Sequence, residues 1–105
     1  MAQHLRAWNA YNSNLFDIYY WRSRSGVEVD FVLYGQKGFY AIEVKNTNRI
    51  RSEDIRSLSE FQKDYPAAKT FFLYRGSEKR MINNILCLPC EQFLKELSPG
   101  SNLYG

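Results

Sequence analysis

The chain has no long hydrophobic run and contains few of the residues that most often carry chemistry. None of its apolar stretches approaches about 18 residues, and no charged-then-apolar leader opens it, so we expect neither a membrane span nor a signal peptide. Histidine occurs once, cysteine twice and proline three times. The phosphate-binding loop G-x-x-x-x-G-K-[ST] is absent, which excludes ATP binding by that route. We therefore expect a soluble, cytoplasmic protein with no membrane partner.

The two cysteines, Cys87 and Cys90, form a single C-x-x-C pair. One pair does not complete a four-ligand zinc site, and His4 is distant in the sequence. A redox dithiol is one interpretation. Because residues 85–88 are apolar, however, we expect the two residues to be free thiols packed in the core, as suits a reducing cytoplasm.

Composition favours one folded domain with a weak basic bias. Its 105 residues include eight tyrosines, seven phenylalanines and two tryptophans, and the hydrophobic content is 45%, enough apolar surface for a core. This composition argues against disorder. The net charge of +3 comes from residues 1–52, which hold seven basic and four acidic side chains. An excess this small is not by itself typical of a nucleic-acid-binding protein.

Hydrophobic alternation predicts an α/β fold with a sheet of mixed direction. Strands are expected at residues 16–21, 27–34 and 39–45, joined as an antiparallel meander. Residues 69–74 form a continuous apolar run, typical of a buried parallel strand that follows a helical crossover. A further short strand is expected at residues 85–88.

Helical spacing predicts three helices around this sheet. The main one begins at the N-cap Ser52, carries Leu58 and Phe61 on its apolar face, and ends before Pro66. Shorter helices are expected at residues 1–10 and 91–97. Residues 98–105 are expected to form a flexible tail.

The turn between the second and third predicted strands decides which charged residues face each other. If Gly35 pairs with Gly38, Asp30 lies opposite Glu43, with Cβ atoms about 4.5–5.5 Å apart. Two carboxylates this close repel unless a proton or a cation lies between them, and oxygen ligands select Mg²⁺, Mn²⁺ or Ca²⁺. This register therefore predicts a metal site. A longer loop would slip the register and turn Asp30 away from Glu43.

The same register places Glu28 opposite Lys45, with all four charged side chains on one face and Val29, Phe31 and Leu33 on the other. A lysine beside a bound metal suits phosphodiester hydrolysis, because the metal lowers the pKa of an attacking water while the lysine orients or stabilises it. The alternative interpretation is a solvated lattice of cross-strand charges.

Two short strings resemble a known family. Residues 27–33 (VEVDFVL) and 42–45 (IEVK) resemble the D…(D/E)-x-K signature of the PD-(D/E)XK nuclease superfamily, whose Asp usually lies in the second core strand and whose E-x-K lies in the third. Residues 20–31 (YWRSRSGVEVDF) are similar to the C-terminal domain of unknown function of many prokaryotic AAA-type ATPases, itself a PD-(D/E)XK-like domain. The usual ending of that domain is matched by residues 72–76, 88–89 and 93–94.

The resemblance implies a restriction-endonuclease-like core over residues 1–97, a mixed central sheet flanked by helices at the C-terminal part of a longer ATPase. Asp30 and Glu43 would bind Mg²⁺ or Mn²⁺, and Lys45 would be the catalytic lysine. Glu28 would be an accessory carboxylate. Gln62 would be an accessory residue, as in RecB-like relatives, although its spacing to the following tyrosine is one residue short of their pattern.

One feature of the superfamily is not matched. Its nucleases commonly add a glutamate from the first helix, whereas no acidic residue precedes Asp17 in this sequence. That glutamate is therefore either upstream or absent.

Basic residues flank the strands that carry the motif, and they allow two interpretations. They can hold the phosphates of DNA, or they can form a solvated rim paired with carboxylates. These residues are Arg22, Arg24, Arg49, Arg51 and Arg56.

Two functions follow from the sequence. The first is a Mg²⁺- or Mn²⁺-dependent nuclease domain that hydrolyses DNA and is attached to an AAA-type ATPase. The alternative is a non-catalytic module of the same fold, which binds DNA or a protein partner and regulates the ATPase.

Overall fold

The fold is described by a computed structural model over residues 7, 16–24, 26–35 and 38–96, with side-chain positions up to residue 93. The predicted helix at residues 1–10, except for helical Ala7, and the predicted tail lie outside these residues. In chain order the elements are β1 (Phe16–Arg22), β2 (Glu28–Gly35), β3 (Gly38–Val44), α2 (Arg56–Asp64), β4 (Lys69–Tyr74), β5 (Arg80–Ile82), β6 (Ile85–Pro89) and α3 (Cys90–Glu96).

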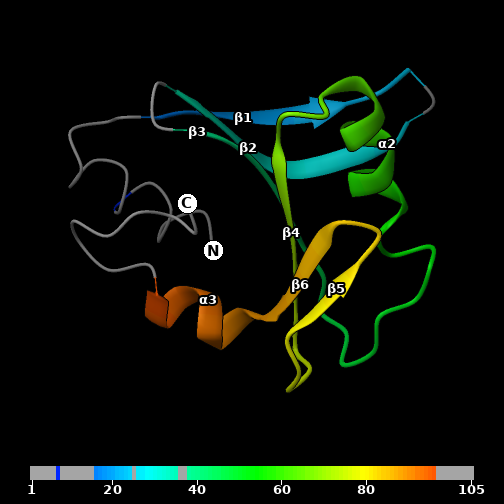
Figure 1. Ribbon diagram of the computed structural model, residues 1–105, viewed down its shortest axis with the longest axis vertical. Helices are drawn as coiled ribbons and strands as arrows, with labels where there is room; N and C mark the ends of the chain where they lie inside the picture. Colours follow the sequence, from blue (N-terminus) through cyan, green and yellow to red (C-terminus); the bar gives the residue numbers. More distant parts are fainter. Residues whose placement is uncertain (1–6, 8–15, 25, 36–37, 97–105) are drawn as a thin grey trace.

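The described strands form one mixed sheet in the order β1-β2-β3-β4-β6-β5 (Figure 1). β1, β2 and β3 pair antiparallel, β3, β4 and β6 pair parallel, and β5 pairs antiparallel with β6. The predicted meander and the parallel strand after a helical crossover are confirmed. β5 was not predicted, because three residues are too short to produce a recognisable alternation.

Helices α2 and α3 cover opposite faces of the sheet (Figure 1). On one face, Leu58 and Phe61 of α2 belong to a cluster with Ala41 of β3. On the other face, Phe93 of α3 belongs to a cluster with Ile42. The α/β class and the mixed sheet are thus confirmed. No helix in the described part of the chain has the length and apolar character needed to cross a membrane.

The start of α2 differs from the prediction. Ser52 is not its N-cap: residues 52–55 form turns, and Ile55 occupies the N-cap position without a side-chain capping bond. The cause is local, since the Asp54 carboxylate accepts a hydrogen bond from the N–H of Arg51 at 3.0 Å and holds this segment in a turn.

The β5–β6 hairpin turns through two residues, Asn83 and Asn84, between the paired residues Ile82 and Ile85. Both asparagines have positive φ, 51° and 65°. This is the conformation that the central residues of a type I′ turn require, and asparagine tolerates it better than most residues do.

A register shift in β2 changes which of its residues share a face. Tyr19 pairs with Val32 and Trp21 pairs with Val29, so two residues of β2 lie opposite Tyr20, as in a β-bulge. Val29 therefore joins Val32 in the cluster beneath α2.

The prediction that Val29, Phe31 and Leu33 share one face is consequently wrong. Phe31 and Leu33 pack on the α3 side, whereas Val29 packs on the α2 side. The period of two holds only for an uninterrupted strand, and the extra residue of the bulge falls at Asp30 and Phe31.

Candidate functional site

The site forms where the pairing of β2 with β3 ends. The predicted register is confirmed: Gly35 pairs with Gly38, and the ladder continues to Phe31 and Ile42. At the next position a side chain replaces a backbone acceptor, because the N–H of Val44 donates a hydrogen bond to Oδ2 of Asp30 at 3.1 Å. The Asp30 carboxylate is thereby fixed beside the end of β3.

Glu43 is the second carboxyl group of the site and is almost completely buried, with 5% of its surface exposed. It lies two residues after Ala41 in β3, so alternation places it on the α2 face. Its pKa is raised to about 8, mainly by burial and then by a hydrogen bond to the Asp30 side chain and by the charge of Asp30. Lys45 and a hydrogen bond from the backbone of Asp30 oppose this rise. At neutral pH Glu43 therefore keeps its proton and is hydrogen-bonded to the Asp30 side chain.

Lys45 follows β3 directly and is exposed. Its backbone N–H donates to the carbonyl of Leu73 in β4 at 2.9 Å, which fixes the position of its Cα. Its positive charge lies close enough to Glu43 to lower the pKa of that carboxyl group. The side chain also lines a cavity of about 460 Å³ together with Asn46 and Arg75.

The carboxyl pair offers only oxygen atoms, which are the ligands of hard cations such as Mg²⁺ and Mn²⁺. Within the described ranges, no group of three or more Asp, Glu, His or Cys residues is placed to hold a metal ion. Two carboxylates are nevertheless sufficient for Mg²⁺, which keeps several waters and commonly binds one or two carboxylates plus substrate phosphates. The donor set of Asp30 and Glu43 therefore fits this ion.

Glu28 is engaged on the β1 side of β2. It lies opposite Arg22, with 3.8 Å between Nε and Oε1, and both side chains are at least half exposed. A hydrogen bond to Glu28 also raises the pKa of Tyr20. The expected pairing of Glu28 with Lys45 is absent from the β2–β3 ladder.

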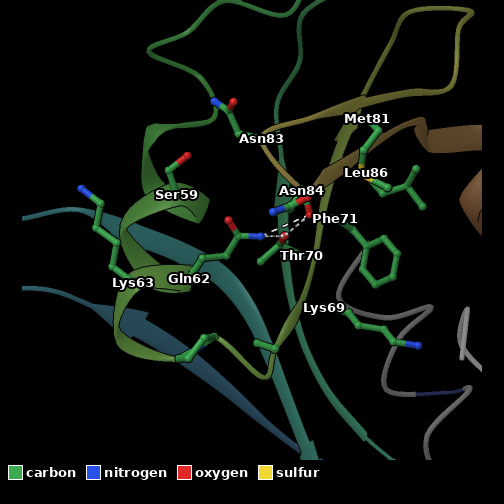
Figure 2. Close-up of a pocket in the computed structure, with 12 residues that line it drawn as sticks. Ser59, Gln62, Lys63, Lys69, Thr70, Phe71, Met81, Asn83, Asn84 and Leu86 are labelled. Carbon is green, nitrogen blue, oxygen red and sulfur yellow. Dashed lines mark hydrogen bonds between the residues drawn. The ribbon is translucent and has the colours of Figure 1, made fainter.

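Gln62 is engaged with β4 and with the β5–β6 turn. Figure 2 shows its amide pointing from α2 to Thr70 and to the turn at Asn84. Nε2 donates to Oγ1 of Thr70 at 2.7 Å and to the carbonyl of Asn84 at 3.2 Å. The adjoining cavity, about 810 Å³, is lined by Gln62 but not by Asp30, Glu43 or Lys45.

The predicted basic residues differ in their partners. Arg22 is paired with Glu28, Arg51 with Glu53 at 3.7 Å and Arg56 with Glu60 at 3.4 Å, so the interpretation as a rim paired with carboxylates applies to these three. Arg24 and Arg49 are exposed.

Arg75 was missed by the sequence analysis. It follows β4 at the same edge of the sheet as Lys45, because β3 and β4 are parallel. Its Nη1 donates to Oδ1 of Asn46 at 3.0 Å, and its backbone N–H donates to the carbonyl of Thr47 at 2.7 Å. Arg75 could have been found from the rule that parallel strands bring their carboxyl ends together, because β3 and β4 were both predicted and Arg75 directly follows β4.

The two cysteines face opposite sides of the sheet. Cys87 is buried in the cluster beneath α2, whereas Cys90 packs against the cluster beneath α3. Both are free thiols, and burial raises the pKa of each. The expected core packing is confirmed for Cys87, and Cys90 is partly buried against the other cluster.

Comparison with known proteins assigns the chain to a family. No curated protein and no solved structure matches it. Residues 1–93 match the family described as a domain of unknown function (DUF4143), a segment that includes every described strand and the candidate site. The chain therefore belongs to the DUF4143 family.

Proposed function

We propose that this chain is a nuclease domain that hydrolyses DNA phosphodiester bonds with Mg²⁺ or Mn²⁺. Asp30 and Glu43 are its metal ligands and Lys45 is its catalytic lysine. The observation that carries the proposal is the buried Glu43, with a pKa of about 8, beside the partly buried Asp30 and the exposed Lys45. A protonated Glu43 hydrogen-bonded to Asp30 offers a divalent cation a pair of oxygen ligands in place of that proton.

The topology supports the same proposal. Asp30 belongs to the second strand of the meander and Glu43 to the third, which is the arrangement of the D…(D/E)-x-K signature. We accordingly propose a restriction-endonuclease-like core and attachment to an upstream AAA-type ATPase, with DNA as the partner.

Each residue of the site has a distinct task in this proposal. When bound, the metal would stabilise negative charge on the phosphate and lower the pKa of the attacking water. Glu43 would release its proton on binding the metal, and Asp30 would remain anchored by the N–H of Val44. The Lys45 ammonium would hold a phosphate oxygen or orient the water.

Metal binding is the first test. Titration calorimetry of the whole 105-residue chain with Mn²⁺ and with Mg²⁺ should give saturable binding, which Asp30→Asn abolishes. Glu53→Gln, which alters an exposed carboxylate paired with Arg51, is the matched control and should bind as the unchanged chain does. Absence of saturable binding at millimolar metal, or equal binding by Asp30→Asn, would overturn the proposal.

Cleavage is the second test. A labelled DNA duplex incubated with Mn²⁺ should be cut by the unchanged chain and by Glu53→Gln. Lys45→Ala should remove cleavage while leaving metal binding in the calorimeter intact. Loss of both together would contradict the catalytic role given to Lys45.

A second candidate is a non-catalytic module of the same fold that binds DNA or a protein partner. The observation that favours it is that the two carboxyl groups have hydrogen-bond partners within the chain. Asp30 accepts the N–H of Val44, and Glu43 bonds to the side chain and to the backbone of Asp30. This candidate predicts no saturable metal binding, together with DNA or protein binding that persists in EDTA.

A further inference from the structure

The carboxyl ends of β3 and β4 carry two cations at one edge of the sheet. The backbone N–H of Lys45 donates to Leu73, and the backbone N–H of Arg75 donates to Thr47, at 2.9 and 2.7 Å. These bonds tie the segment after β3 to the end of β4. Lys45 and Arg75 are therefore held in fixed positions relative to one another, and both are exposed.

Arg75 differs from three other arginines of the described chain in the partner of its side chain. Arg22, Arg51 and Arg56 lie within 3.4–3.8 Å of carboxylates. The Arg75 guanidinium instead donates to the neutral amide of Asn46 at 3.0 Å. Within the described part of the chain no carboxylate forms an ion pair with Arg75, although Glu91 lines the same cavity of about 460 Å³. The Asn46 bond uses one of the five N–H donors of the guanidinium.

The segment beside Arg75 is ordered by its own hydrogen bonds. The Thr47 hydroxyl donates to the carbonyl of Arg49 at 3.0 Å and accepts the N–H of Arg49 at 3.3 Å. Arg75 borders two of the cavities beside it. One, of about 530 Å³, is lined by Asn46, Thr47, Asn48 and Arg75. The other is the cavity of about 460 Å³ that Lys45 lines.

We infer that Arg75 and Lys45 bind a phosphate group of the DNA backbone at this edge, with Arg75 oriented by Asn46. A guanidinium matches two phosphate oxygens with parallel N–H donors, and a nearby ammonium adds a point charge. Amide and hydroxyl groups around the cavity are the neutral donors that commonly accompany phosphate contacts. The inference rests on the proposed function for the identity of the polymer, and it adds a binding residue outside the D…(D/E)-x-K motif.

The test is the binding of a fluorescein-labelled DNA duplex in EDTA, followed by anisotropy at several salt concentrations. EDTA removes metal binding and cleavage, so the result is independent of the nuclease chemistry. Arg75→Gln should weaken binding about tenfold, the effect of losing a hydrogen bond to a charged group. It should also reduce the slope of log K against log salt by about one, the effect of one lost phosphate contact.

Two further variants sharpen the result. Lys63→Gln removes one positive charge from an exposed position on α2 and should leave affinity and slope close to those of the unchanged chain. Asn46→Asp keeps the shape of the Arg75 partner but adds a carboxylate beside the guanidinium, so it should weaken binding as Arg75→Gln does. It serves as the decisive variant if Arg75→Gln does not fold.

The outcomes separate this inference from the proposed function. If Arg75→Gln and Asn46→Asp bind DNA with the same affinity and salt slope as Lys63→Gln and the unchanged chain, the phosphate assignment is overturned. The proposed metal site is not affected by that result. Absence of DNA binding by the unchanged chain in EDTA would also overturn it. Binding that depends on Arg75 in a chain that neither binds metal nor cuts DNA would support the inference and overturn the nuclease.

Discussion

Asp30 accepts the backbone N–H of Val44 through its side chain, at 3.1 Å, where the β2–β3 ladder stops. One carboxylate therefore closes the end of a strand pair and also forms half of the candidate metal site. The β-bulge opposite Tyr20 makes this possible, because bulges re-aim side chains and end regular pairing. Stability and function are consequently linked at this residue.

Glu43→Gln should remove a pH dependence of folding. The pKa of Glu43 is 4.5 when unperturbed and about 8 in the folded chain, so the folded state binds the proton more tightly. The stabilisation from this proton is complete below pH 4.5 and is lost as pH rises to about 8. Glutamine mimics the protonated acid, so the variant should match the unchanged chain in acid and exceed it above pH 8 by roughly a few kcal/mol.

Urea unfolding in metal-free buffer, followed by tryptophan fluorescence across this pH range, measures the difference. Glu53→Gln is the control, since its exposed carboxylate should leave the pH profile unchanged. Parallel profiles for Glu43→Gln and the unchanged chain would show that Glu43 ionises normally in the folded state.

Gln62→Ala should lower stability without affecting the metal site. The substitution removes the hydrogen bonds to Thr70 and Asn84, which join α2 to β4 and to the β5–β6 turn. We expect a loss of about 1–2 kcal/mol in the free energy of unfolding. Lys63→Ala, on the same helix but exposed, should change it by about 0.5 kcal/mol or less. Loss of cleavage by Gln62→Ala at unchanged stability would instead favour the accessory catalytic role suggested by the resemblance.

Gly76→Ala should destabilise the chain through Tyr74. A Cβ at position 76 would overlap the Tyr74 ring and lie 2.8 Å from its hydroxyl oxygen. The ring is buried, and its hydroxyl donates to the carbonyl of Glu78 at 2.6 Å, so it cannot easily move aside. We expect a cost of about 1–3 kcal/mol by thermal unfolding. In a Tyr74→Leu background the cost should shrink, and equal costs in the two backgrounds would rule out the ring as the cause.

Much of the sheet could be predicted from local sequence patterns. The alternation of residues 39–45 and the apolar run of residues 69–74 correspond to β3 and β4. The bulge could not be predicted from residues 27–31, which alternate regularly, because its extra residue arises only from pairing with β1. The late start of α2 was also missed, since it depends on a turn closed by Asp54.

The candidate site was predictable to the extent that its geometry is local. The Gly35–Gly38 pair is separated by only two residues, so the register of the ladder up to Phe31 and Ile42, which brings Asp30 near Glu43, followed from the turn. The burial of Glu43 could be predicted only by knowing which face of the sheet α2 covers. The place of Arg75 beside Lys45 could be predicted only from the parallel pairing of β3 with β4, which joins residues far apart in the sequence.

The position of β3 has a consequence for the order of assembly. β3 has an antiparallel neighbour on one side and a parallel neighbour on the other. The hairpin that joins Asp30 to Glu43 closes a short loop, whereas β4 docks only after α2 has crossed over the sheet, and local contacts form faster than distant ones. Folding would thus assemble the acidic side of the site first and add Arg75 last. A partly folded chain would present the two carboxyl groups and Lys45 without Arg75, so the proposed phosphate contact would be complete only once β4 is in place.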